Sequence, residues 1–350
     1  MPDRLRRVAA AAGRGPVADV AARVVDRALP RRRGSLSILT YHRVDEPSAR
    51  PDLMPSLISA TPRDFASQIA LVAHDFDPVS LGDVIDALDD PRRLPRRAVL
   101  VTFDDGYRDF ATNAWPILRD ASVPATLFVA TAFTDQPSRS FWWDRLWSAV
   151  ADAEPETVDT PIGPLPVGPG AAKATVARLR TWLKDLDHDA VLLEVERLVD
   201  RLDSRPGASG DGDGTDTLAP AILDWDELRR LAGEGVTLAP HTRHHPLLDR
   251  VSLDRAVDEI RGSLSDLERQ TGKVVPVPPV LAYPSGSAGE SAVEAARRAD
   301  MRLAMTTKRG GNDLRRDDLL RLHRINVGGR SSVPIIRSQL AWAGSLDVVR

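Results

Sequence analysis

The stretch AVLVTFDDGY at residues 98–107 decides the fold class of this 350-residue chain. Its first six residues form an almost continuous apolar run, which is typical of a strand buried on both faces in a parallel sheet. Two aspartates and a glycine follow directly, where such a strand would end. A second run of this kind, ATLFVA at residues 125–130, comes after a predicted helix over residues 113–121. The pattern predicts a β–α–β unit with carboxylates at the carboxyl end of its first strand.

Strand–helix alternation continues on both sides of this unit. Upstream, LSILTYHRV at residues 36–44 predicts a strand, followed by helices over residues 61–76 and 80–88. Downstream, short apolar strands alternate with three further predicted helices, at residues 224–232, 253–270 and 288–298. We therefore expect an α/β fold, either a barrel or a doubly wound sheet. Both place their chemistry at the carboxyl ends of the strands.

Residues 135–222 interrupt this alternation. Two helical patterns, at about residues 172–186 and 189–202, lie between a Pro/Gly-rich stretch and a Gly/Asp-rich one. They predict an inserted helical hairpin with flexible joints. An aromatic cluster opens the interruption, and it either packs the insert onto the domain or forms a wall for sugar rings. Its members are Phe141, Trp142, Trp143 and Trp147.

The first 34 residues form a basic arm, with nine Arg against three Asp. Apolar residues at helical spacing predict an amphipathic helix that either packs on the domain or makes a peripheral contact with an anionic membrane. No apolar core of about 7–15 residues is present, so no secretory signal is predicted. We expect a cytoplasmic location or one at the cytoplasmic membrane surface, with a single domain over residues 35–350.

Composition excludes several classes of function. A net charge of −3 argues against a nucleic-acid partner, because proteins that neutralise phosphates usually carry excess basic residues. The chain has no Cys, which excludes thiol catalysis and Cys-based metal sites.

Polar clusters directly follow the apolar runs. All three tyrosines and four of the seven histidines of the chain lie in these clusters. The clusters are Tyr41-His42-Arg43, Asp104-Asp105-Gly106-Tyr107, His241-Thr242-Arg243-His244-His245 and Tyr283-Pro284-Ser285-Gly286.

Two of these clusters have the composition of a metal site. Adjacent carboxylates such as Asp104 and Asp105 cannot both be stable anions without a cation nearby, so one could bind a metal while the other acts as a base. His241 and His245 are four residues apart, which suits two imidazole ligands, and His244 is a competing ligand. Two His and one Asp leave one coordination position open for water. The alternatives are a plain Asp-Asp-Gly turn and histidines with surface or capping roles.

The order of these motifs resembles a known family. TFDDG at 102–106, HTRHHP at 241–246 and AYPSG at 282–286 look like the first three motifs of the polysaccharide deacetylases with NodB homology. Tyr41–Val44 and the segment RLHRINV at 321–327 resemble further elements of one branch of that family. The resemblance covers residues 35–134 and 223–330. It implies a distorted (β/α) barrel and a divalent metal, usually Zn²⁺, with Co²⁺, Ni²⁺ or Fe²⁺ also compatible with the ligands.

The resemblance also implies roles for individual residues. Asp105, His241 and His245 would be the metal ligands. Asp104 would be the base that takes a proton from the attacking water. A backbone N–H within Tyr283, Pro284 and Ser285 would stabilise the oxyanion, together with the metal.

Two positions depart from the family pattern. The family often has an Arg two residues before the proline of its third motif, and here this position is Ala282. We expect Arg321 or Arg324 to supply that charge from another strand. The family's closing Leu-x-His motif is one residue longer here, so that His323 is the first candidate for the general acid and His42 the second.

By this resemblance the protein is expected to be a metal-dependent hydrolase. It would remove N-acetyl groups from N-acetylhexosamine units of a glycan, including a lipid-linked glycan, and release acetate and a free amine. The alternatives are an O-acetyl ester hydrolase that uses the same site and a non-catalytic glycan-binding protein of the same fold.

Overall fold

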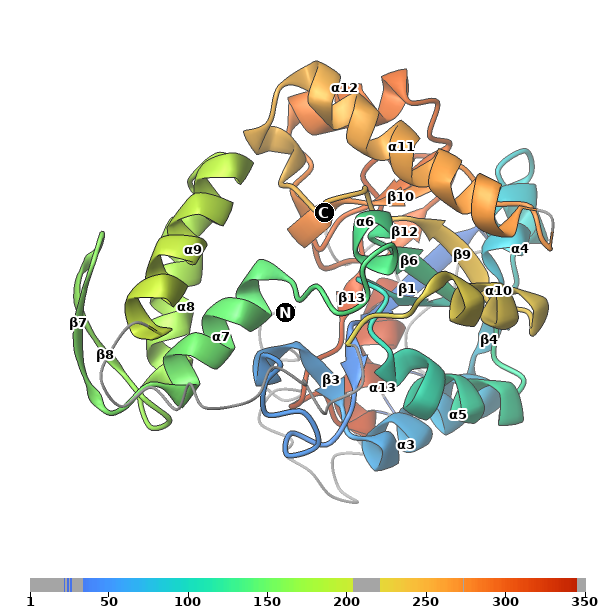
Figure 1. Cartoon of the computed structure of the whole chain (residues 1–350). Coiled ribbons are helices and arrows are strands. Elements are labelled where there is room, and N and C mark those ends of the chain that lie inside the picture. The colour runs from blue at the N-terminus through green and yellow to red at the C-terminus, as the bar shows by residue number, and fades with distance from the viewer. Residues whose placement is uncertain are drawn as a thin grey trace, which may run out of the picture.

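The computed structural model describes Ala22, Val24, Asp26 and residues 34–203, 221–272 and 274–344 (Figure 1). Its centre is a parallel sheet in which neighbouring strands follow one another along the chain. These strands are β1 (Ser35–Tyr41), β5 (Ala98–Phe103), β6 (Ala125–Val129) and β9 (Thr237–Pro240). The prediction of buried parallel strands is confirmed, because every residue of β1, β5 and β6 is buried.

The sheet closes into a distorted barrel. On its far edge β1 pairs in parallel with β13 (Ile325–Asn326), and Leu322, just before β13, bridges to β11 (Leu303–Met305). β11 pairs in turn with β10 (Val280–Ala282). Between β10 and β9 no strand pairing joins the described residues, which is the distortion. The structure therefore selects the barrel over the doubly wound sheet.

Short strands extend the barrel at its edges. β2 (Arg43–Val44) pairs with β3 (Ile58–Ala60), and β4 (Asp77–Val79) pairs with the first half of β5. β12 (Asn312–Asp313) runs antiparallel to the start of β1.

The alternation of side chains along the strands separates two apolar cores. One core collects residues such as Leu36, Ile38 and Leu100 with side chains from β6, β9, β10 and β11, which places it inside the barrel. The residues between them, such as Leu39 and Val101, pack outward against the surrounding helices. Because successive strand residues point to opposite faces, Asp104 continues the inward-facing series that begins with Leu100.

Helices surround the barrel in the order that the sequence predicts. Half of them begin at a capping side chain: Thr61 accepts from Asp64 N–H, for example, and Asp224 forms a capping box with Glu227. The predicted helix at 113–121 is divided into a π-turn, Phe110–Ala114, and α5. The helices around the barrel are α3 (Pro62–Asp75), α4 (Leu81–Asp86), α5 (Trp115–Asp120), α6 (Thr131–Thr134), α10 (Trp225–Gly233), α11 (Leu253–Thr271), α12 (Glu290–Arg298) and α13 (Val333–Ala343).

The interruption forms a separate layer at one side of the barrel (Figure 1). The two predicted helices are present, but the Pro/Gly-rich stretch is not a flexible joint. It forms an antiparallel β-hairpin in which Pro164 and Pro166 are exposed while Leu165 and Val167 are buried. Proline is tolerated here because β8 has a partner on one edge only. The elements are α7 (Trp142–Asp152), β7 (Glu156–Thr160), β8 (Gly163–Val167), α8 (Ala172–Leu183) and α9 (His188–Asp203).

The insert, defined as α7 to α9 with the β7–β8 hairpin, has its own apolar core. This core joins residues of α8 and α9 to Tyr107, which follows β5, and to Phe133 of α6. The predicted Gly/Asp-rich joint lies outside the described residues.

Only a small part of the predicted N-terminal arm falls within the described residues. There Asp26 is 5% exposed and pairs with Arg97 at 2.7 Å and with Arg337 at 3.6 Å. These contacts favour packing of the arm on the domain, and nothing in the described part supports the predicted membrane contact. Among the described residues, no helix has the length and apolar character that crossing a bilayer requires.

Candidate metal and catalytic site

The two aspartates after β5 are separated by a turn in the backbone. The N–H of Asp104 still donates to the carbonyl of Tyr41 at 3.0 Å, so its side chain keeps the inward direction of the strand. Asp105 and Gly106 then adopt positive φ values of 77° and 84°. Positive φ is uncommon for a residue with a Cβ and tends to cluster at functional sites. The turn brings both carboxylates to the same end of the barrel.

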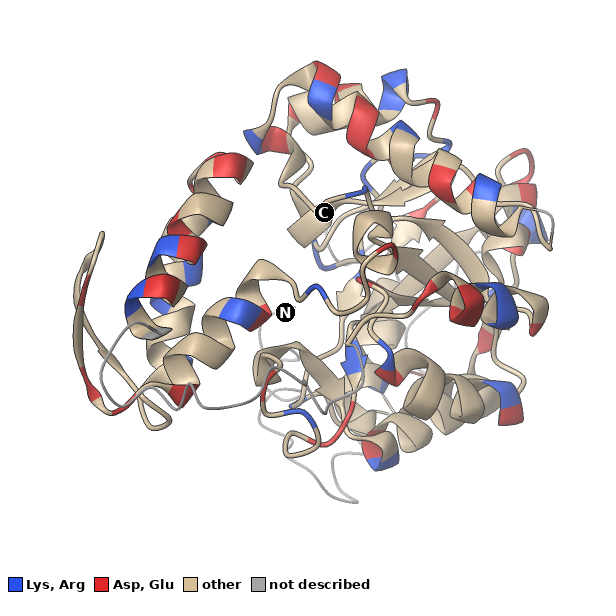
Figure 2. Ribbon diagram, in the orientation of Figure 1, with Lys and Arg blue, Asp and Glu red and all other residues tan. Residues whose placement is uncertain are grey.

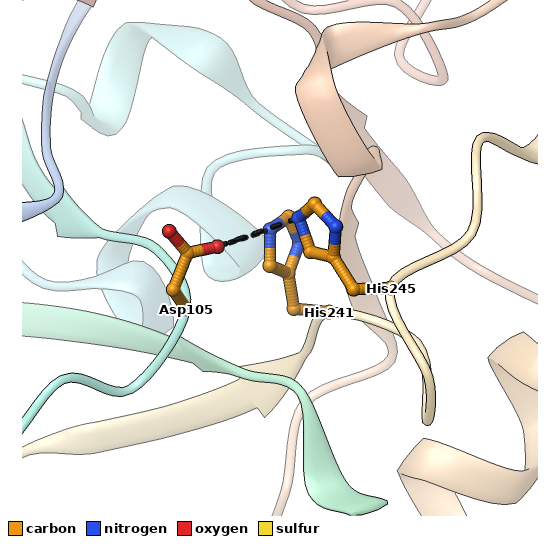
Figure 3. Close-up of side chains that lie close together, drawn as sticks. All are labelled: Asp105, His241 and His245. Carbon is orange, nitrogen blue, oxygen red and sulfur yellow. Dashed lines mark ion pairs between the residues drawn. The ribbon is translucent and has the colours of Figure 1, made fainter. Parts of the chain in front are cut away.

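Asp105, His241 and His245 converge as the sequence predicts (Figure 3). Oδ1 of Asp105 lies 3.4 Å from Nε2 of each histidine, and one ligand atom from each of the three lies within 4.8 Å of the others. The histidines lie on a tight loop after β9, in which Thr242 and His245 have positive φ. Thr242 Oγ1 accepts a hydrogen bond from His245 N–H at 3.1 Å and holds this loop closed.

The donor set fits a tetrahedral divalent ion. Bonds of about 2.0–2.1 Å to nitrogen and oxygen at tetrahedral angles separate two ligand atoms by roughly 3.3 Å, close to the 3.4 Å seen from Asp105 to each histidine. Nδ1 of His241 lies 2.7 Å from the carbonyl oxygen of Ala282. This contact assigns a proton to Nδ1 and makes Nε2, on the side of Asp105, the atom that can bind a metal.

His244, the competing ligand, turns away from this group. Its Nδ1 lies 2.9 Å from Oε1 of Glu259, and its backbone N–H donates to Oε2 of the same carboxylate. Glu259 therefore anchors the loop from outside the site.

The carboxylate of Asp105 is held in its charged form. Burial works to raise its pKa, but hydrogen bonds from His241 and His245 and the charge of His42 outweigh burial and keep the pKa of Asp105 well below its usual range. An ionised oxygen is the form that binds a metal ion.

Asp104 forms an ion pair with Arg324, which lies 220 residues further along the chain. Nη1 and Nη2 of Arg324 donate to the two carboxylate oxygens at 2.8 and 2.7 Å, and both side chains are buried. Nε of Arg324 donates to the carbonyl of Thr306, which fixes the guanidinium plane. Burial raises the pKa of Asp104, but the charge of Arg324 more than reverses this and leaves the pKa below its usual value.

This pairing confirms one of the two alternatives for the missing arginine. Arg321, the other alternative, is tied instead to Glu290 and Asp318 at the surface.

The two candidates for the general acid occupy different places. His42 follows β1, is half-buried, and donates its backbone N–H to Ser59 Oγ at 2.9 Å. Its charge acts on the pKa of both Asp104 and Asp105. His323, the first candidate, neighbours Arg324 on an extended segment and so points to the opposite side. Its Nδ1 lies 2.6 Å from the position that a Cβ on Gly310 would take.

The charge of His42 thus acts on both aspartates, and Asp104 is contacted by Arg324 and not by the neighbouring His323. The Leu-x-His motif predicts His323 as the first candidate, because so short a motif does not show which side chains before β13 face the barrel interior.

Of the three residues proposed around the oxyanion, one keeps an available donor. The N–H of Tyr283 donates to the carbonyl of Met305 at 3.0 Å, and its hydroxyl donates to the carbonyl of Leu320. Pro284 has no N–H. This leaves the N–H of Ser285, a residue that has a φ of 53° and lines a cavity together with His245.

The insert contributes a second group, in which the sequence analysis did not identify Asp144. Trp143 of α7 packs edge-on against the His245 ring, with centroids 4.9 Å apart. Its Nε1 donates to the hydroxyl of Tyr107, which donates in turn to the buried Asp144 at 2.5 Å. Burial raises the pKa of Asp144 to about 6. Trp143 therefore packs the insert onto the barrel, as predicted for the aromatic cluster. Trp142 of the same cluster lines a cavity beside His245.

These features define the class of protein: an α/β barrel with a candidate metal-dependent hydrolase centre at the carboxyl ends of its strands. The sequence model of the polysaccharide deacetylase family matches residues 92–160 and 163–304, more than half of the chain. The chain belongs to the polysaccharide deacetylase family.

Individual relatives are similar over shorter spans. A poly-beta-1,6-N-acetyl-D-glucosamine N-deacetylase of Escherichia coli K12 is 32% identical over 100 residues, which cover 29% of this chain and 14% of the relative. A protein of the same description from Staphylococcus epidermidis is 31% identical over 115 residues, 30% of this chain and 39% of the relative. The matches thus span well under half of either relative's length.

A solved structure resembles nearly the whole fold. The Streptococcus pyogenes deacetylase PplD in complex with acetate superimposes with a TM-score of 0.58 at 20% identity, covering 87% of this chain and 98% of that one. At this identity the comparison concerns the fold alone, which it confirms as a deacetylase-type barrel.

Proposed function

We propose that this protein hydrolyses the N-acetyl group of an N-acetylhexosamine unit in a glycan or glycoconjugate, in a reaction that depends on a divalent metal. The observation that carries the proposal is a pair of adjacent carboxylates in different settings. Oδ1 of Asp105 lies 3.4 Å from Nε2 of both His241 and His245. Both carboxylate oxygens of Asp104, in contrast, accept hydrogen bonds from Arg324. The names of the two curated relatives support an N-acetylated glycan as the substrate.

Asp105, His241 and His245 would hold the metal, and a divalent ion at that position supplies a water of lowered pKa and polarises the acetyl carbonyl. Asp104 accepts the proton of the attacking water, a contribution of about 10²–10⁴-fold. The bidentate contact with Arg324 fixes the direction of the Asp104 oxygens and keeps the carboxylate ionised.

Two further groups complete the reaction. The N–H of Ser285 donates to the carbonyl oxygen as negative charge develops on it. When the C–N bond breaks, the amine needs a proton, and we assign its delivery to His42. The balance is one water consumed, with one acetate and one free amine released.

Acetate release tests the proposal. Zinc-loaded wild type and Asp104→Asn are compared on N-acetylglucosamine oligosaccharides and on O-acetylated sugars, each with and without chelator. We expect chelator-sensitive release from the N-acetylated substrate, a loss of at least 10²-fold in the variant, and unchanged zinc content. Release from O-acetyl esters alone would identify an esterase. Zinc lost together with activity in Asp104→Asn would mean that the roles of the two aspartates are exchanged.

A further inference from the structure

A small, solvent-open cavity with an accessible volume of about 20 Å³ lies between the insert and the barrel. Seven of its lining residues come from the insert and four from the barrel loops, including His245 and Ser285. The cavity therefore adjoins the place where the acetamido group would react. A substrate with its acetyl group at the metal site would place a neighbouring small group at the opening of this cavity.

The lining carries positive charge without any carboxylate. Lys184 at the end of α8 and Arg250 of the barrel both face the cavity, and none of the residues that line it is Asp or Glu. Acidic and basic residues are otherwise mixed over the outer helices (Figure 2). Arg250 forms an ion pair with Asp185, in which Nη2 lies 3.5 Å from Oδ1.

Lys184 has no ion pair among the described residues, although it is only partly exposed. Burial and the nearby charge of Arg180 lower its pKa below the usual value. A buried cation beside a second cation is unfavourable unless an anion compensates both.

Arg180 is four residues before Lys184 on the same helix, so the two are neighbours on one face. Its Nη1 contacts Met54 Sδ at 3.3 Å, and its buried Nε has no hydrogen-bond partner. The carboxylates that influence Arg180, those of Asp144 and Asp105, are already bonded to Tyr107 and to the two histidines. Neither cation is therefore neutralised by a carboxylate contact within the described fold.

The rest of the cavity wall suits a sugar. Trp142 and Leu247 present apolar surface beside Lys184. His188 adds no positive charge at neutral pH, because burial and the charge of Arg255 lower its pKa to about 4. The cavity thus combines an apolar wall with one cation, Lys184, that has no carboxylate partner among the described residues.

We infer that this cavity binds an anionic group, a phosphate or a carboxylate, that the substrate carries next to its N-acetylated sugar, with Lys184 as the main contact. This inference rests on the proposed deacetylase function. It narrows the substrate from any N-acetylated glycan to one that is charged close to the reacting unit.

The test compares matched substrates on the zinc-loaded enzyme: neutral di-N-acetylchitobiose, its 1-phosphate, and a hyaluronan tetrasaccharide in which a uronic acid adjoins the N-acetylated sugar. We expect kcat/KM at least tenfold higher for an anionic substrate than for the neutral one, with the advantage reduced at high salt. The better of the two anions identifies phosphate or carboxylate as the ligand. Equal kcat/KM for all three would overturn the inference while leaving the deacetylase function in place.

The variant Lys184→Gln tests the residue itself. A charge-assisted hydrogen bond corresponds to about 10- to 100-fold in affinity, so the ratio of anionic to neutral kcat/KM should fall by that factor. Lys173→Gln is the matched control, because Lys173 is an exposed lysine of the same helix, and its ratio should not change. Equal ratios in both variants would refute the role of Lys184.

A binding experiment separates this inference from the proposed function. Calorimetric titration of the full-length, zinc-loaded protein with chitobiose 1-phosphate and with the hyaluronan tetrasaccharide needs no turnover. If no substrate releases acetate but Lys184→Glu weakens binding of one anion at least tenfold relative to Lys173→Glu, the anion site stands and the proposed reaction fails. Binding of both anions that is absent, or equal in the two variants, rejects the anion site.

Discussion

Arg324 illustrates how a side chain far along the chain supplies a charge that the local motif lacks. The position two residues before Pro284 is Ala282, and a guanidinium reaches Asp104 instead from the segment before β13. Both side chains of the pair are buried. Its geometry is therefore set by the surrounding packing and by the hydrogen bond from Nε of Arg324 to the carbonyl of Thr306. A carboxylate with fixed direction and fixed charge is what proton abstraction requires.

Replacing Arg324 by Met should destabilise the fold strongly. Removing one member of a buried ion pair leaves an uncompensated charge and costs about 3–5 kcal/mol. The measurement is the free energy of unfolding in urea at pH 7. Arg321→Met is the control, because the pairs of Arg321 lie at the surface and should cost no more than about 1 kcal/mol. Similar losses in the two variants would contradict the assigned importance of the Asp104 pair.

The two histidines that competed as general acid can be separated by kinetics. His42→Gln should lower kcat by about 10²–10⁴-fold, because the leaving amine loses its proton donor. His323→Gln should change kcat only a few-fold, since His323 points away from the aspartates. Both variants are assayed for acetate release, with zinc content measured to show that the metal site is intact. The opposite ranking would restore His323 as the acid.

Among the elements, α7 connects the insert to the loop after β9 that carries His241 and His245. Trp143 packs on His245, and the adjacent Asp144 accepts hydrogen bonds from Tyr107 and from the backbone N–H of Met54. One helical turn thus joins the loop after β5, the loop before β3 and the loop after β9. The insert is therefore part of the wall of the site.

Asp144 makes the stability of this junction dependent on pH. Its folded-state pKa of about 6 lies above the ordinary 3.8, so the folded protein holds a proton that the unfolded chain releases. The protonated Asp144 therefore contributes fully to the free energy of unfolding below about pH 4. As the pH rises to about 6, the free energy of unfolding falls by roughly 3 kcal/mol.

Asp144→Asn should remove this loss. Urea unfolding at pH 4, 5, 6 and 7 should show a flatter profile than wild type between pH 4 and pH 6. Asp152→Asn is the control, because Asp152 is exposed on the same helix and should leave the wild-type profile unchanged. An Asp144→Asn profile as steep as that of wild type would show that the carboxylate is ionised throughout.

At the scale of the whole molecule, the site joins parts of the chain that are far apart in sequence. Asp105 follows β5 and the histidines follow β9, with the insert between them. A ligand that binds only when these parts are assembled stabilises the folded state by mass action.

Zinc should therefore raise the stability of the entire barrel. At a free concentration 100 times its Kd, the gain is about 2.7 kcal/mol, measured as the shift in thermal unfolding between zinc-loaded and chelated protein. His245→Ala should lose most of this shift. His244→Ala should retain it, because His244 is bonded to Glu259 outside the site. Loss of the shift in His244→Ala alone would make His244 the ligand.

The sequence by itself determined the strand–helix alternation, the order of the polar clusters and the identity of Asp104, Asp105, His241 and His245. These follow from local information: the period of apolar residues and the residue types where strands end. The pattern was wrong about the Pro/Gly-rich joint, where the alternation of buried and exposed residues in β8 is too short to be distinguished from a loop.

Only the tertiary structure decided the partner of Asp104 and the cavity beside Lys184. Each depends on how segments distant in sequence meet when the barrel closes. A one-residue difference at the approach to β13 exchanges the inward and outward faces, and the inward position there is that of Arg324, which contacts Asp104.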